Sequence, residues 1–130
     1  MNPLAVIILT STRTKYAIET IRAANRYLHC AYGVLFYVAC DNSNDAHVSQ
    51  IFPQFVDDTV LGYHVDNLGY GGAVNLAMKN IMGGYPVHLM LEDDWILSQD
   101  LDVTPYVELL HNRDDIGMVR LGHMPINLDL

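Results

Sequence analysis

The sequence has little positive charge. Seven lysine and arginine residues face fifteen aspartate and glutamate residues, which gives a net charge of −8. Nucleic-acid binding generally needs a basic surface, so we expect no nucleic-acid partner. A site for a phosphorylated ligand would also have to take its positive charge from a cation or from backbone N–H groups.

Cysteine, long apolar runs and familiar catalytic patterns are scarce as well. Cys30 and Cys40 each end an apolar segment, so we expect reduced, buried thiols and no disulfide framework. No apolar run approaches ~20 residues, which argues against a transmembrane segment. The start of the chain lacks the basic and apolar regions of a secretory signal, so we expect a cytoplasmic protein. No Ser-His-Asp or Cys-His arrangement and no Walker-type glycine-lysine loop can be read from the sequence.

The remaining composition is that of a folded domain. The chain is 51% hydrophobic and 17% charged, which predicts one domain over residues 1–130 with a real core. Apolar runs of strand length are expected at residues 4–10, 34–40, 59–65, 87–91 and 116–121. Helices are expected at residues 15–30, 46–52, 68–82 and 105–111. This alternation predicts an α/β fold, a three-layer sandwich with a mostly parallel central sheet.

The most informative stretch is residues 87–95, where an apolar run ends in Glu92, Asp93 and Asp94. Three adjacent acids do not suit a strand interior, so the chain should emerge there, at the edge where open α/β sheets bind ligands. In an extended chain Glu92 and Asp94 would point together while Asp93 points away. Adjacent carboxylates repel one another, and a hard cation such as Mg²⁺ or Mn²⁺ between them would remove the repulsion. A solvated acidic turn explains the same residues.

Three further polar segments each follow an expected strand, at residues 10–13, 41–45 and 66–72. If the strands are parallel, all three lie at the same edge as the acids. The glycines of the third segment partly imitate a dinucleotide-binding fingerprint, which keeps a nicotinamide-dependent oxidoreductase as a minor alternative. Against it, Val74 occupies the third small position, and two complete strand–helix units precede the motif.

Four segments carry a family resemblance when they are taken in order. They are Val6-Ile7-Ile8-Leu9-Thr10 with Arg13 after it, Asp41-Asn42-Ser43-Asn44-Asp45, the run from Asn67 to Asn75, and Leu91-Glu92-Asp93-Asp94. Together they resemble the nucleotide-sugar-binding half of an inverting, family-two glycosyltransferase with the GT-A fold, over nearly the whole chain. The resemblance implies an enzyme that transfers a sugar from a nucleotide-diphosphate sugar to an acceptor that the sequence does not identify.

The resemblance also implies roles for individual residues. Thr10, Ser11 and Arg13 would border the nucleotide. Asp41 would hydrogen-bond the base, and the adjacent Asn42 would also belong to the nucleotide-sugar site. The segment that closes over the nucleotide and sugar would contribute Asn67, Gly69, Gly71, Gly72 and Asn75. The triplet would stand for the family's Asp-x-Asp motif, with Glu92 and Asp93 on the donor and with Asp94 and Glu92 holding Mn²⁺ or Mg²⁺. That cation would offset the charge that builds on the diphosphate as the glycosidic bond breaks.

Two positions depart from the family pattern, and one function is missing. Glu92 replaces the usual first Asp, and Val74 stands where many members have Arg, so the donor class stays open. An inverting transfer needs a base to deprotonate the acceptor, and in such enzymes it comes from residues after the last expected strand. The catalytic base is therefore unknown, and we expect the chain to be a fragment, a minimal form or one that takes its base from elsewhere. A non-catalytic nucleotide-binding module within a larger assembly is the alternative function.

Overall fold

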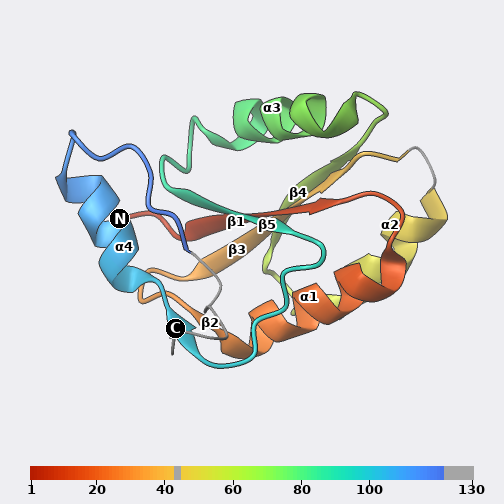
Figure 1. Ribbon diagram of the computed structural model, residues 1–130, viewed down its shortest axis with the longest axis horizontal. Helices are drawn as coiled ribbons and strands as arrows, with labels where there is room; N and C mark the ends of the chain where they lie inside the picture. Colours follow the sequence, from red (N-terminus) through yellow and green to blue (C-terminus); the bar gives the residue numbers. More distant parts are fainter. Residues whose placement is uncertain (43–44, 122–130) are drawn as a thin grey trace, which may run out of the picture.

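The central sheet consists of four parallel strands, β1 (Leu4–Thr10), β3 (Val34–Cys40), β4 (Val60–Val65) and β5 (His88–Glu92). Their order is β4-β3-β1-β5, which makes this a Rossmann-like α/β fold, as the alternation predicted. The computed structural model describes residues 1–42 and 45–121. The carboxyl ends of the strands point to the right in Figure 1.

Helices cover both faces of this sheet. The connections from β1 to β3 and from β3 to β4 carry α1 (Thr14–Tyr27) and α2 (Asp45–Ile51), which lie below the sheet in Figure 1. The return from β4 to β5 carries α3 (Gly69–Ile81), which lies above it. Right-handed crossovers require this change of face, because β3 and β4 are added on one side of β1 and β5 is added on the other. The expected three-layer arrangement is therefore confirmed.

The β1 strand is the centre of the core, because all seven of its residues are buried. Its alternate side chains serve the two layers. Val6 and Ile8 pack with the α1 residues Ala17 and Ile21, whereas Ile7 and its neighbours pack on the α3 side. A strand that is covered on both faces has no solvent-facing positions, which explains why its sequence is apolar without alternation.

The structure contradicts the secondary structure expected from the sequence at two places. The first helix ends at Tyr27, and Leu28–His29 form a short strand, β2, that pairs in parallel with β6 (Leu101–Asp102). The segment at 116–121 was expected to be a strand, but it forms none; Met118 there is 78% exposed. A β-branched, apolar pattern favours a strand only if a neighbouring strand offers its hydrogen bonds. Residues 122–130 lie outside the described residues.

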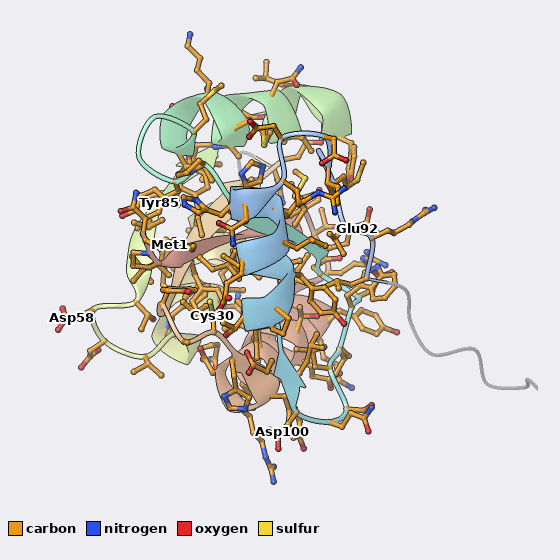
Figure 2. The ribbon with its side chains drawn as sticks, turned by 90° about the vertical axis from the view of Figure 1, so that its left-hand side faces the viewer. Met1, Cys30, Asp58, Tyr85, Glu92 and Asp100 are labelled. Atoms are coloured by element: carbon orange, nitrogen blue, oxygen red, sulfur yellow. The ribbon has the colours of Figure 1, made fainter. Side chains whose placement is uncertain are left out.

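The chain after β5 runs back along α1 to β6 and α4 (Thr104–Asn112). Val107 of α4 joins the same core as α1. Figure 2 views the molecule from the side of α4, with Asp100 on the α1 side and Glu92 closer to the level of the sheet. Among the described helices, none has the length and apolar character needed to cross a membrane.

Candidate active site

The four polar segments meet at the carboxyl edge, as the parallel arrangement predicted. The hydroxyl of Ser11, after β1, donates to the backbone oxygen of Asp41, after β3, at 2.9 Å. The Asp41 carboxylate in turn accepts the backbone N–H of Gly69, at the start of α3, at 3.0 Å. The Tyr70 hydroxyl then donates to Glu92 at the end of β5, at 3.1 Å. A continuous series of hydrogen bonds thus links residues that lie far apart in the sequence.

These segments enclose a pocket of about 340 Å³. That size lies at the lower end of small-molecule sites, which span roughly 300–1,000 Å³. The polar part of its wall includes Thr10, Ser11, Thr12, Arg13, Asp41, Glu92 and Asp93. All of these except Thr12 were predicted site residues. They bring three carboxylates and one guanidinium to the same surface, so the wall is acidic.

Asp93 differs in burial from Glu92 and Asp94, as the extended pattern suggested, and it forms part of the wall of this pocket. It is 3% exposed, and it accepts hydrogen bonds from the Thr10 hydroxyl at 3.1 Å and from Arg13 at 2.5 Å. The chain leaves the strand at Glu92 and turns, with the backbone N–H of Trp95 donating to the Glu92 carbonyl. Glu92 and Asp94, on either side of Asp93, are both exposed, which agrees with the alternation expected of an extended chain.

Arg13 is the counter-charge of the acidic triplet. Its guanidinium contacts Asp93 and, at 3.4 Å, also Asp94, while Glu92 is bonded to Tyr70 instead. Attraction by Asp93 is the main cause that raises the pKa of Arg13. Two of the three acids therefore share a protein cation, whereas the sequence alone had suggested a metal between Glu92 and Asp94.

A buried histidine that does not line the pocket contacts Thr10, the residue that donates to Asp93. His47 of α2 is 3% exposed, and its ring lies between two hydroxyls, with Nε2 2.7 Å from Thr10 Oγ1 and Nδ1 2.6 Å from Thr14 Oγ1. Burial lowers the pKa of His47, and the nearby Asp93 opposes that shift. The sequence offered no signal for His47, because it belongs to no motif and lies 37 positions from Thr10.

A second polar network orders the turn into α3. Asp66 accepts the backbone N–H of Leu68 at 2.9 Å and lies 2.9 Å from His64 Nε2, without the angles of a hydrogen bond. His64 Nδ1 lies 2.9 Å from the hydroxyl of Tyr37, which also accepts a hydrogen bond from Asn80. Burial lowers the pKa of His64. This network holds the turn that leads to Gly69 and Tyr70.

Seven predicted site residues do not line the pocket: Asn42, Asn67, Gly69, Gly71, Gly72, Asn75 and Asp94. Helix geometry explains most of this set. Since α3 begins at Gly69, Tyr70 and Ala73 are one turn apart on the side that lines the pocket, and Asn75 is exposed elsewhere. Tyr70 and Ala73 were not predicted, although their spacing of three would have indicated them once the start of the helix was known.

Two of the glycines have a conformational reason that involves no ligand. Gly69 adopts a φ of +79°, which favours glycine. A Cβ on Gly72 would lie 2.4 Å from the Cβ of Leu68, so no side chain fits there without a shift of the backbone. Gly71 has open space instead, since a Cβ there would meet nothing within 4 Å among the described residues.

The acids of the triplet do not by themselves form a complete site for a divalent cation among the described residues. Within residues 1–42 and 45–121, no three His, Cys, Asp or Glu side chains are grouped closely enough to hold a metal ion without other ligands. Glu92 and Asp94 are exposed, and each keeps one carboxylate oxygen outside the hydrogen bonds of the described chain. Mg²⁺ and Mn²⁺ accept a few such oxygens and complete their shell with water and phosphate. A cation at Glu92 and Asp94 would therefore need further ligands from a bound phosphorylated molecule and from water.

The fold and the pocket classify this chain only coarsely. The sheet order and the parallel strands establish a small Rossmann-like domain. Many unrelated functions occur on such folds, so the fold does not determine the activity. A scan against protein-family models and a search of the curated proteins both found no match.

Proposed function

We propose that this domain binds a nucleotide-diphosphate sugar in the pocket and is the donor-binding part of a metal-dependent glycosyltransferase with the GT-A fold. The observation that supports this most is the convergence of the four polar segments around a buried Asp93. Ligands of open α/β sheets bind beyond the carboxyl ends of the strands, where the strand order reverses. In this sheet the order reverses between β1 and β5, which end at Thr10 and Glu92.

The charges of the pocket favour a cation as part of this function. Asp41, Glu92 and Asp93 face a single cationic side chain, Arg13. A diphosphate would be repelled by such a wall unless a cation lay between them. We assign Glu92 and Asp94 as its ligands, because both are exposed, whereas the carboxylate of Asp93 is buried against Thr10 and Arg13. When bound, the metal would stabilise the diphosphate leaving group.

The other polar residues have roles that follow from their positions. Asp41 holds the start of α3 and lines the pocket, so it is placed to contact the base or the ribose. The Tyr70 ring is 60% exposed beside the pocket and offers a surface on which a base can stack. Arg13 is half exposed and lines the pocket, so it is placed to contact an anionic group.

The location of the glycines disfavours a nicotinamide-dependent oxidoreductase. In dinucleotide-binding folds the glycine-rich turn follows the first, central strand. In this protein β1 is followed by Ser11-Thr12-Arg13, and the glycines follow β4, at the edge of the sheet. A non-catalytic nucleotide-binding module is the second candidate, because Arg13 already balances Asp93 and Asp94 without a metal.

A thermal-shift panel of nucleoside diphosphates, with and without Mn²⁺, tests the proposal. A ligand that binds the folded state raises the melting temperature. We expect at least one nucleotide to stabilise the protein strongly with Mn²⁺ and weakly without it. Asp94→Ala should abolish this Mn²⁺-dependent part, whereas Asp57→Ala, an exposed control before β4, should leave it unchanged.

Three outcomes separate the hypotheses. If no nucleoside diphosphate shifts the melting temperature, the nucleotide-sugar site is wrong. If Asp94→Ala keeps the full Mn²⁺ dependence in calorimetry, the metal assignment is wrong although the nucleotide site stands. Slow release of free sugar from a nucleotide-diphosphate sugar would favour the transferase over the non-catalytic module, because hydrolysis requires a working donor site.

A further inference from the structure

We infer that His47 is a positioning residue for the pocket: through Thr10 it fixes the carboxylate of Asp93 and, with it, the guanidinium of Arg13. Neither His47 nor Thr14 lines the pocket, so both act through other side chains. The part of this inference that concerns ligand affinity rests on the proposed function. The part that concerns the orientation of the side chains does not.

The direction of each hydrogen bond follows from the chemistry of Asp93. A carboxylate only accepts, so the Thr10 hydroxyl donates its single proton to Asp93 Oδ2. The Thr10 oxygen must then accept from His47, which requires a proton on Nε2. Because burial favours the neutral ring, Nδ1 carries no proton and accepts from the Thr14 hydroxyl. The structure thus assigns the neutral Nε2–H tautomer to His47.

This relay connects three elements that meet only in the folded protein. Thr14 begins α1, His47 lies in α2, and Thr10 ends β1. The backbone oxygen of Asp93 is held separately by the Thr20 hydroxyl of α1, at 2.7 Å. With both its backbone and its carboxylate held, Asp93 presents Oδ1 to Arg13 in one orientation. Polar networks of this kind are effective when every member is satisfied, as here.

Two variants of His47 separate positioning from simple filling of space. His47→Leu keeps an apolar side chain of similar size but removes both hydrogen bonds. His47→Gln retains an amide donor that can reach Thr10. The matched control is His88→Leu, because His88 is a half-buried histidine that lies at the amino end of β5 and does not line the pocket.

The first readout is affinity for whichever of UDP, GDP, ADP or CDP gives the largest thermal shift with Mn²⁺. We expect His47→Leu to weaken binding about tenfold, since a buried donor and acceptor lose their partners. His47→Gln should recover most of this loss, and His88→Leu should bind as the parent does.

A double-mutant cycle tests whether His47 acts through Thr10. Thr10→Val should weaken binding about as much as His47→Leu, and the double variant should lose little more, because both changes break one relay. Equal loss in the Leu and Gln variants, or additive losses, would overturn the inference.

The second readout needs no ligand and uses the unmodified protein. Long-range ¹⁵N–¹H NMR spectra report which ring nitrogen of each histidine is protonated, and His47→Gln identifies the signals of His47. We expect a neutral ring with the proton on Nε2 at pH 7.5. We also expect the Arg13 guanidinium signals to show restricted rotation, which the Gln variant preserves. A proton on Nδ1, or freely rotating Arg13 signals, would contradict the inference, even if no nucleotide binds and the proposed function fails.

Discussion

The guanidinium of Arg13 and the carboxylate of Asp93 form an ion pair in the wall of the pocket, with Nη2 2.5 Å from Oδ1. The two partners differ in their environment, since the side chain of Asp93 is 5% exposed and that of Arg13 is 50% exposed. A buried carboxylate is unfavourable without a partner, whereas an exposed guanidinium remains available to a ligand. This asymmetry makes Arg13 both a support for Asp93 and a contact for an anion.

Arg13→Gln is expected to change nucleotide binding and metal binding in opposite directions. The affinity for a nucleoside diphosphate should fall, because the pocket loses its only cationic lining side chain among the described residues. The affinity for Mn²⁺ alone should rise, because Asp93 and Asp94 lose their counter-charge. Titration calorimetry with MnCl₂ and with the nucleotide measures both. Arg13→Lys is the control that keeps the charge, and a weaker Mn²⁺ affinity in the Gln variant would contradict the role of Arg13.

Substitutions of Asp41 separate its hydrogen bond from its charge. Asp41→Ala removes the acceptor of the Gly69 N–H and should lower the free energy of unfolding by about 1 kcal/mol. Asp41→Asn keeps a carbonyl oxygen at that position and should retain nearly all of the stability. Urea unfolding measures both variants. If the two variants lose equal stability, the contact with Gly69 does not hold α3 in place.

Neighbouring glycines in the first turn of α3 should respond differently to alanine. Gly72→Ala places a Cβ 2.4 Å from the Cβ of Leu68 and should destabilise the protein by about 1–3 kcal/mol. Gly71→Ala meets open space and should be neutral or stabilise by about 0.5–1 kcal/mol. Adding Leu68→Gly to the first variant should restore part of the loss. Similar melting temperatures for the two alanine variants would show that this steric contact is not significant.

Stability should fall on mild acidification. Burial lowers the pKa of His47, His64 and His88 below the ordinary value of 6.5, so the unfolded chain takes up protons first. The free energy of unfolding should therefore decrease as the pH falls below about 6.5. The carboxyl groups of Asp102 and Asp115 have lowered pKa values, so their contribution is lost only in much stronger acid. Urea unfolding at pH 7.5 and 5.5 checks this, and His88→Leu should reduce the difference. Equal stability at both pH values would contradict it.

Local pattern was enough to place the main strands and the edge that carries the site. Apolar runs without alternation predicted β1 and β3 at the residues where they occur, because strands covered on both faces have no polar positions. The strict alternation of strands and helices predicted a parallel sheet, and a parallel sheet brings the ends of its strands to one edge. Thr10, Asp41 and Glu92 could therefore be assigned to a common pocket from the sequence.

The partners of these residues depended on packing between segments that are distant in the sequence. Arg13 and Asp93 are 80 positions apart, and their contact requires both the turn after β5 and the exit of β1. His47 reaches Thr10 only because α2 packs beside α1, which no pattern within α2 reveals. The periodicity of a sequence indicates which faces of a segment are apolar. The direction of a polar side chain at the end of a strand depends instead on the neighbours that folding brings next to it.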